Sequence, residues 1–174
     1  GSSSGVAIAV QSLCQEAGVI FMAGLTHSND TTGKDRRANG FRHFFNTEMS
    51  GAALGPVLKN AFGTDRTAYH LTADYTWGWS QEGSIKKYTE QLGWKTAAAV
   101  RTPLGAGDFS QYITPVLNSG ADVLVLLIVT LGETFKQSTV NLMAPLLLDP
   151  VQQIAEQVII ENEDLSVRAP LLAA

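Results

Sequence analysis

The first candidate for ligand chemistry is a run of hydroxyl side chains at the start of the chain. Ser2, Ser3 and Ser4 stand directly before an apolar pattern that repeats at helical spacing and stops at Gly18. Hydroxyls and free backbone amides at a helix N-terminus, where the helix dipole is positive, suit a bound carboxylate. The structural alternative is that Ser4 caps the helix, while Ser2 and Ser3 belong to a ragged terminus.

A second group of candidates follows a short buried strand predicted at 19–23. The loop from Thr26 to Gly40 is rich in Thr, Asn, Asp and Gly, and a loop of that length often carries function. Its residues Thr26 and Ser28 offer short polar groups just after the strand. The alternative is a turn-rich loop that uses its Thr and Asn side chains to satisfy its own backbone. The residues alone leave both interpretations open.

Aromatic side chains form a third group. Tyr75, Trp77 and Trp79 cannot all face one way in an extended segment, so at least one is expected at the surface or in a cleft. We select Trp77, whose indole offers a flat apolar face and one hydrogen-bond donor, although such residues are also common in cores. Asp74 could bind an ammonium group or cap the helix predicted from Ser80, and capping is favoured.

Catalytic chemistry has little support in the sequence. His27, His43 and His70 lack the i, i+4 spacing that gathers zinc ligands on a helix, and no Gly-x-Ser-x-Gly motif holds a nucleophile. Cys14 falls on the apolar face of its helix and is interpreted as a small buried hydrophobe. We therefore expect a protein that is not an enzyme and that has no catalytic residue, metal or cofactor.

Composition excludes other classes of function. The 174 residues are 45% apolar and 16% charged, which is typical of a chain that folds around one substantial core or two small ones. No apolar run approaches the roughly 20 residues that cross a bilayer. The formal net charge is −4 with no basic stripe, so we expect no nucleic-acid partner.

Strands and helices alternate along the chain. Thr47 is predicted to cap a helix that ends at Gly63 and carries Met49, Ala52, Ala53, Val57 and Ala61. Asp108 is predicted to begin another, with Phe109, Tyr112, Ile113, Val116 and Leu117 on one face and Pro115 bending or shortening it. The other predicted elements are a strand or extended crossover at 41–46, strands 68–72, 96–101 and 121–129, helices 80–92 and 132–143, and a helix or strand at 151–160.

This order predicts the fold class and the place of a ligand. The continuous apolar run 121–129 is typical of a central parallel strand covered on both faces. The alternation favours an open, mostly parallel α/β sheet in three layers, with helices on both faces. Ligands are expected at the carboxyl ends of its strands.

Six segments occur in an order that carries a family resemblance. Together they resemble the branched-chain amino acid and amide type of ABC-transporter solute-binding protein, which has the periplasmic binding protein type I fold. The likeness covers residues 1–137, and its strength lies in the series. The segments are Ser2–Ser4, Thr26–Asn29 with Thr31–Gly33, Phe41–Arg42, Asp74–Gly78, Gly107–Ser110 and Gly120–Val125.

The resemblance implies roles for the candidate residues. Such proteins hold a solute in a cleft between two lobes joined by crossover strands. The serine loop, here Ser2 and Ser3, would meet the α-carboxylate of the solute. Thr26 and Ser28 match positions whose backbone carbonyl and hydroxyl groups meet the amino and carboxylate groups of the solute, and on this resemblance we favour a binding role for both. Trp77 matches an aromatic residue of the second lobe that closes over the solute.

The resemblance also implies a partner and a compartment. We expect an amino acid or small amide-like solute, an ABC permease as the membrane partner, and the periplasm as the location. In the family the serine motif lies well inside the first lobe, so we expect a truncated chain. Residues 1–42 would supply the end of that lobe and the crossover, and 43–137 the second lobe; the placement of 138–174 is uncertain.

A different class of function stays open on the same residues. A truncated α/β sheet exposes an edge, and such an edge can be completed by a second copy. The alternative is thus an assembly or regulatory module that forms a homodimer through this edge and binds no solute.

Overall fold

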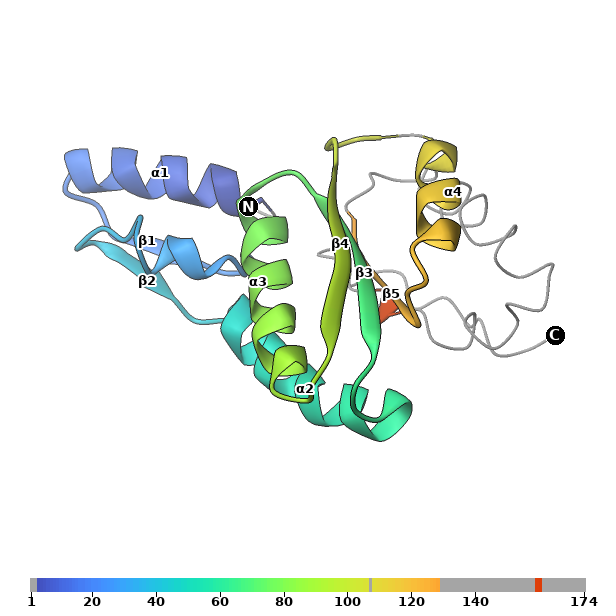
Figure 1. The fold of residues 1–174 in the computed structure, drawn as a ribbon. Coiled ribbons are helices and arrows are strands. Elements are labelled where there is room, and N and C mark those ends of the chain that lie inside the picture. Colours follow the sequence, from blue (N-terminus) through green and yellow to red (C-terminus); the bar gives the residue numbers. More distant parts are fainter. Residues whose placement is uncertain (1–2, 107, 129–158, 161–174) are drawn as a thin grey trace, which may run out of the picture.

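Two separate parallel sheets organise the chain in the computed structural model (Figure 1). The structure describes residues 3–106, 108–128 and 159–160. Within the predicted C-terminal segment 138–174, it therefore describes residues 159–160, and the helix predicted at 132–143 lies outside the described residues. No helix in the described ranges is both long enough and apolar enough to cross a membrane.

The smaller sheet belongs to the N-terminal part. Helix α1 (Ser4–Glu16) precedes β1 (Phe21–Ala23), and β1 pairs in parallel with β2 (Gly40–Arg42). The chain leaves α1 through Gly18, whose φ of 68° is the left-handed conformation that favours glycine. Gly18 thus has the predicted place just after the helix.

The N-cap predicted for this first helix is wrong by one residue. Ser3 is the N-cap of α1, and its side chain makes no capping hydrogen bond. Ser4 is the first helical residue and is fully buried. Its hydroxyl oxygen accepts a hydrogen bond from the backbone N–H of Ser28 at 3.2 Å instead. A long-range contact has therefore replaced the local cap.

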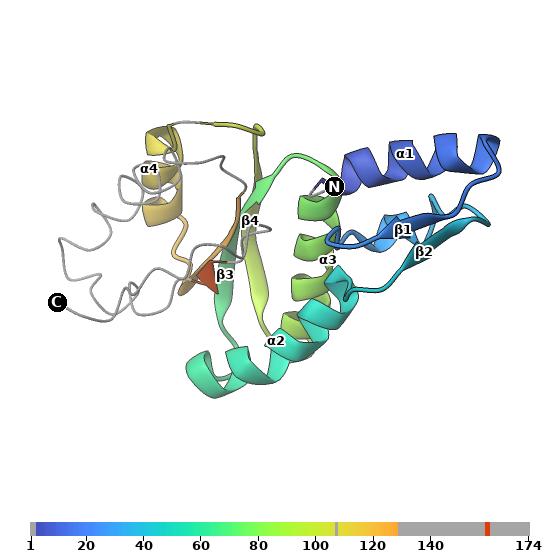
Figure 2. The ribbon, with the colours of Figure 1, turned by 180° about the vertical axis from the view of Figure 1, so that it is seen from behind.

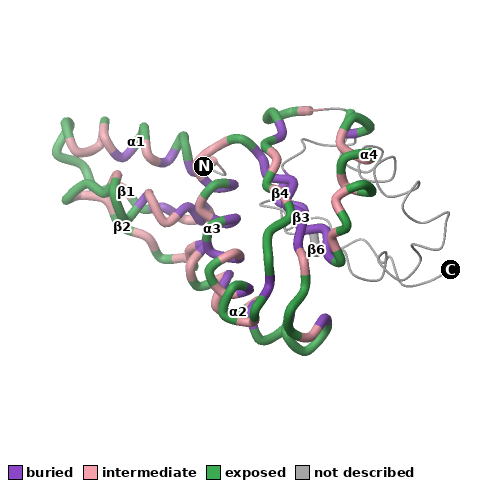
Figure 3. Tube along the Cα trace, in the orientation of Figure 1, coloured by how far each residue is buried: buried purple, intermediate pink, exposed green. Residues whose placement is uncertain are grey.

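The larger sheet has the strand order β4-β3-β5-β6, and all its pairs are parallel. Strands β3 (Thr67–Ala73) and β5 (Val123–Leu127) are almost entirely buried, as Figure 3 shows. The edge strand β4 (Lys95–Thr102) is mostly exposed, and β6 (Ile159–Ile160) pairs with the other side of β5. The prediction of a central strand in the run 121–129 is confirmed over Val123–Leu127, and residue 129 lies outside the described residues.

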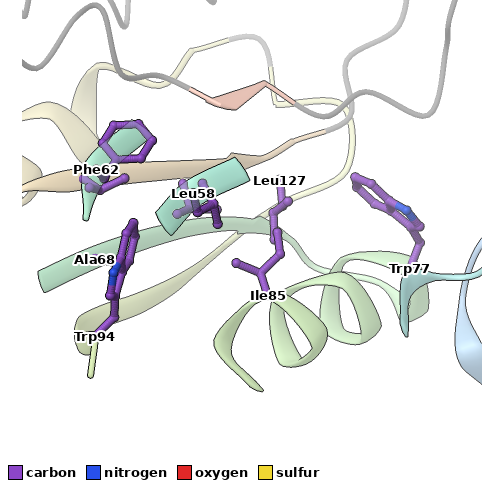
Figure 4. Close-up of a cluster of buried hydrophobic side chains, with 9 residues drawn as sticks. Leu58, Phe62, Ala68, Trp77, Ile85, Trp94 and Leu127 are labelled. Atoms are coloured by element: carbon purple, nitrogen blue, oxygen red, sulfur yellow. The ribbon is translucent and has the colours of Figure 1, made fainter. Parts of the chain in front are cut away.

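Helices cover both faces of the larger sheet. Helices α2 (Thr47–Phe62) and α3 (Thr76–Glu90) lie on one face, and α4 (Ser110–Asn118) lies on the other (Figures 1 and 2). This arrangement confirms the predicted three layers. The core on the α2 and α3 side, shown in Figure 4, consists of Leu58, Phe62, Ala68, Trp77, Ile85, Trp94, Val123, Val125 and Leu127.

The predicted buried face of α2 is wrong. Met49 and Val57 are 60% and 59% exposed, and the buried residues of this helix are Thr47, Gly51, Gly55, Leu58 and Phe62. The glycines determine which face of α2 packs against α3, because a Cβ on Gly51 would lie 2.4 Å from the hydroxyl oxygen of Ser84 on α3. Close approach of the two helices thus outweighs side-chain hydrophobicity. Asn46, not Thr47, is the N-cap, and its side chain accepts from the N–H of Met49.

Helix α3 begins four residues before its predicted start. Trp77 and Trp79 therefore lie on a helix and not in an extended segment. Trp79 is 48% exposed, whereas Trp77 is 1% exposed, so Trp79 is the indole at the surface, and a place for Trp77 in a cleft stays a prediction. Helical geometry turns residues two positions apart through about 200°, which places the two indoles on nearly opposite faces.

Helix α4 keeps its predicted cap with a later start. The Asp108 carboxylate accepts from the backbone N–H of Ser110 at 2.8 Å and from its hydroxyl at 2.9 Å, and these bonds lower the pKa of Asp108. Pro115 lies inside a helix of nine residues. Four of the five predicted apolar residues pack against the sheet, but Leu117 is 48% exposed.

A buried carboxylate ties α3 to the sheet. Glu82, 4% exposed, accepts a hydrogen bond from Thr72 Oγ1 at 2.6 Å and pairs with Lys86 Nζ at 2.8 Å and Arg101 Nη1 at 2.9 Å. Burial by itself would raise the pKa of Glu82. The hydrogen bonds from Lys86 and Thr72 and the charges of Lys86 and Arg101 outweigh burial, and the pKa lies below its usual value.

Glu82→Gln is expected to lower the free energy of unfolding at pH 7 by about 2 kcal/mol, because Lys86 and Arg101 lose their common counter-charge. Their own side chains reach solvent, which limits the loss. Urea unfolding followed by circular dichroism measures the change. The control is Glu90→Gln on the exposed side of the same helix, which should change the free energy by less than about 0.5 kcal/mol. Equal stability of the two variants would contradict the prediction.

Candidate functional site

Three segments meet where the smaller sheet approaches the larger one. They are the N-terminus of α1, the loop 26–31 that follows β1, and the N-terminus of α3 (Figure 1); we call this place the junction. Ser28 links all three, because its N–H donates to Ser4 Oγ and its hydroxyl lies 3.0 Å from Thr76 Oγ1. The neighbouring N–H of Asn29 donates to Ser80 Oγ at 3.0 Å. The predicted loop residues thus contact both helices directly.

An acidic side chain of the loop is already partnered at the junction. Asp30 Oδ2 accepts a hydrogen bond from Thr76 Oγ1 at 2.9 Å and forms an ion pair with Lys34 at 3.0 Å. The backbone N–H of Asp30 donates to Ser28 Oγ, which closes a short local turn. These contacts tie the loop to α3, and Lys34 balances the negative charge of Asp30.

Arg42, at the end of β2, makes direct contacts at the junction, although the sequence analysis assigned it no role. Its guanidinium donates to the backbone carbonyl oxygens of both Thr26 and Ser28. The planar fork of donors suits two neighbouring carbonyls. The segment Phe41–Arg42 belonged to the resembling series, and an unpaired loop carbonyl after a buried strand needs a donor. Those two signals together could have identified Arg42.

The predicted loop and serine residues fall in different environments. Thr26 is 1% exposed and Ser28 is fully buried, and the hydroxyl of Thr26 has no hydrogen-bond partner among the described residues. Ser3 lies half-buried at the start of α1. Ser2 lies outside the described residues. The structure thus brings Thr26, Ser28 and the first turn of α1 together.

Trp77 and Asp74 lie at the carboxyl end of β3 but do not share an environment. Trp77 packs in the core at the end nearest the junction (Figure 4), and its indole N–H has no partner among the described residues. Asp74 is exposed and accepts a hydrogen bond from Trp79 Nε1 at 2.9 Å. The favoured capping role of Asp74 is wrong, since no side chain caps α3 at its N-cap Tyr75.

His27 adds an aromatic and electrostatic feature to the junction. Its ring is stacked on Phe45 and Phe44, with centroid distances of 4.3 Å and 5.3 Å. Burial, followed by the positive charge of Arg42, lowers the pKa of His27. Arg42 and the N-terminal ends of α1 and α3 contribute positive charge at the junction, beside the ion pair of Asp30 and Lys34.

Other kinds of site receive less support within the described ranges. The described residues hold no cluster of three or more His, Cys, Asp or Glu side chains that could bind a metal ion. A shallow, open depression on α2 is lined by Pro56, Val57, Lys59 and Asn60. None of these residues belongs to the junction.

Comparison with protein families identifies two stretches of the chain. The family model described as "Periplasmic binding protein" matches residues 1–138. A second family model, described as "FliW protein", matches residues 111–171. The two matches share residues 111–138, which include most of α4 and all of β5.

Solved structures show the same fold as this chain. A periplasmic binding protein from Burkholderia mallei superposes with a TM-score of 0.73 at 19% identity, covering 91% of this chain and 40% of that protein. An amino acid ABC transporter substrate-binding protein from Pseudomonas fluorescens gives 0.67 at 24% identity, covering 91% and 40%. A solute-binding protein of an ABC transporter from Rhodopseudomonas palustris, in complex with p-hydroxybenzoic acid, gives 0.67 at 26% identity, covering 82% and 37%. The predicted periplasmic binding protein type I-like fold is confirmed.

A curated relative is similar to part of this chain. The flagellar assembly factor FliW of Clostridioides difficile is 36% identical over 56 residues, which are 32% of this chain and 43% of that protein. The chain thus spans less than half the length of the curated relative and about 40% of the length of the first solved structures.

Proposed function

This chain belongs to the periplasmic binding protein family, and from that membership we propose that it serves as the solute-binding component of an ABC importer. The solute would be an amino acid, a small amide or another small carboxylic acid. It would be held at the junction and passed to a membrane permease. The periplasm is the corresponding location. The convergence of α1, the loop 26–31 and α3 on Ser28 is the observation that carries this proposal.

The proposed mechanism is closure of two lobes around the solute. The first lobe and crossover, residues 1–42, would hold the polar end of the solute through Ser2, Ser3, Thr26 and Ser28. The second lobe, residues 43–137, would bring Trp77 over it, with Asp74 at the rim. With this division, the hydrogen bonds that join Ser28 and Asn29 to α3 would link the two lobes. Opening would break them, and a bound solute would supply replacements.

Isothermal titration calorimetry with the full chain tests the proposal. The panel contains L-amino acids, their amides and aromatic acids, including p-hydroxybenzoate because a solved relative binds it. We expect saturable binding of at least one compound with a micromolar dissociation constant. Absence of binding across the panel, with the fold verified by circular dichroism, would reject the proposal.

Trp77→Phe is expected to weaken that binding about tenfold, equivalent to about 1.4 kcal/mol, because the indole face and its donor are lost. Trp94→Phe is the matched control. Trp94 lies in the same core at its far end and donates to the carbonyl of Gly63 (Figure 4). Both variants should lose stability, but Trp94→Phe should keep the wild-type affinity. Equal affinities of the two variants would remove Trp77 from the binding site.

A second candidate function rests on the C-terminal match. The likeness of residues 111–171 to flagellar assembly factors favours a contribution to flagellar assembly. Expression of the full chain in a strain that lacks its own flagellar assembly factor should then partly restore swimming. The control is a chain that ends at residue 137, which should not restore it. Equal swimming with both chains would reject this candidate.

The assembly alternative from the sequence is tested beside these. In the described sheet, β4 forms an edge strand with exposed residues, where a second copy could add its own strand. Light scattering of the full chain separates the hypotheses. A tight dimer without solute binding supports assembly, and a monomer with micromolar binding supports transport.

A further inference from the structure

Helix α2 carries a row of exposed residues that includes two predicted to be buried, Met49 and Ala53. Met49 is 60% exposed, and Ala53, Pro56 and Asn60 are exposed as well. Their spacing of four, three and four residues places all of them within about 60° around the helix. We call this row the α2 face, and it lies along the lower edge of the view in Figure 2. A mostly apolar exposed face of this kind is typical of an interaction surface.

The α2 face has a hollow near one end and an exposed, adaptable side chain at the other. A shallow depression in the C-terminal half of α2 is lined by Pro56, Val57, Lys59 and Asn60. Met49 stands in the first turn, and methionine adapts its shape to irregular gaps. Because Met49 and Asn60 are about 16 Å apart along the helix, Met49 cannot fill the depression of its own helix. The same side chain from an antiparallel second copy of α2 can.

The charges beside the α2 face fit the same antiparallel arrangement. Glu48, near the start of the helix, and the exposed Lys59, near its end, differ by about 20° around the helix, so they flank the face on the same side. In an antiparallel helix pair, equivalent flanks face each other, which brings Glu48 of one copy toward Lys59 of the other. Glu48 already pairs with Lys87 and accepts from Tyr88 at 2.8 Å. The exposed contact therefore contributes to the orientation of the pair more than to its strength.

We propose that two copies of this chain form a symmetric dimer through the α2 face, with the two helices antiparallel and Met49 of each copy in the depression of the other. In a twofold interface the same patch serves on both sides, so one hollow and one exposed side chain on the same helix are matched twice. Ala53 of one copy then lies beside Pro56 of the other, where its small side chain permits close approach. The dimer goes beyond the proposed solute binding and does not depend on it, and it uses a different surface from the edge strand β4.

The size of the contact predicts a weak dimer. Helix α2 has 16 residues and is about 24 Å long. One helix pair of that length buries less than the roughly 1,200 Å² at the lower limit of standard stable interfaces. We therefore expect a dissociation constant of about 10–100 µM. Sedimentation velocity of the full chain from about 1 µM to about 500 µM should show a monomer at the lower end and a dimer at the upper end. A monomer throughout this range would overturn the proposal.

Ala53→Glu places a carboxylate at the centre of the α2 face and should weaken the dimer about tenfold or more. The matched control is Ala9→Glu. Ala9 is an exposed alanine on α1, beside the exposed apolar residues Val6 and Leu13, and this variant should dimerise like the wild type. Circular dichroism verifies that both variants fold. Loss of the dimer in Ala9→Glu but not in Ala53→Glu would place the interface on α1 and overturn the proposal, and loss in neither variant would overturn it too.

Disulfide cross-linking tests the antiparallel arrangement independently, and it still decides the matter if Ala53→Glu fails to fold. Met49→Cys and Asn60→Cys are prepared as separate variants with Cys14→Ser, which removes the native free thiol. Mixed under mild oxidation at a concentration where the wild type is dimeric, they should form a covalent dimer that contains one copy of each. Either variant alone should cross-link about tenfold more slowly, because its two thiols lie far apart. Equally fast cross-linking of Met49→Cys alone would overturn the antiparallel arrangement.

Discussion

Replacement of Gly78 by alanine is expected to lower the free energy of unfolding by about 3 kcal/mol. Gly78 lies in the first turn of α3, where the helix folds back against the end of β3. A Cβ at this position would lie 2.1 Å from the carbonyl oxygen of Ala73 and 3.1 Å from Thr72 Cγ2. Because the contacted atom belongs to the backbone, either the helix or the strand would have to move.

Gly83→Ala is the matched control for this prediction. Gly83 lies on the same helix, and a Cβ there would meet nothing within 4 Å. Alanine favours the helix over glycine, so this variant should gain up to about 1 kcal/mol. Urea unfolding measures both changes. A Gly78→Ala variant as stable as the wild type would show that the end of β3 and the start of α3 are not in such close contact.

The stability of the protein is expected to fall as the pH is lowered from about 6.5 to about 4. His70 lies on the central part of β3, is fully buried, and has no hydrogen-bond partner for either ring nitrogen among the described residues. Burial, together with the positive charges of Lys86 and Arg101, lowers the pKa of His70 from 6.5 to about 4, against an opposing effect of Glu82.

The direction of this effect follows from which state binds the proton. Above pH 6.5, His70 is neutral in the folded and the unfolded chain. Between pH 6.5 and about 4, the unfolded chain binds a proton at His70 that the folded chain does not bind. Unfolding is therefore favoured as the pH falls. At about 1.4 kcal/mol per pH unit, the total loss is about 3 kcal/mol.

Unfolding free energies measured at several pH values check this expectation. His70→Leu removes the titrating group from a site that offers it no hydrogen bond, so its stability should change much less between pH 6.5 and 4.5. The pKa of His27 is also lowered, and the variant should keep that smaller slope of the same sign. Parallel pH profiles of the wild type and His70→Leu would contradict the assignment.

Strands of the larger sheet were predictable because their sequence signals are local. The run that became β5 is continuously apolar, and that pattern is typical of a strand covered on both faces. The face of α2 was not predictable in the same way. Its buried face includes Gly51 and Gly55, which let α3 approach closely because they have no side chain, so a pattern of apolar residues does not mark this face.

The sequence was sufficient to predict where the loop residues of the candidate site lie, but not the environment of the aromatic residue Trp77. Thr26 and Ser28 stand where a strand ends, and the structure places both at the junction. The environment of Trp77 depended on where α3 begins, and no cap residue marks that start because Tyr75 makes no side-chain capping bond. The role of Arg42 depends on contacts between residues 14 and 16 positions apart, which no local pattern contains.

The strand order of the larger sheet indicates how much the sequence after β5 could vary. The pairs β4-β3 and β3-β5, together with the helices on both faces, are complete by Leu127. Beyond Leu127, the described residues 159–160 add strand β6 beside β5, and the likeness to flagellar assembly factors spans residues 111–171. The sequence after β5 could therefore differ between proteins without loss of the β4-β3 and β3-β5 pairs.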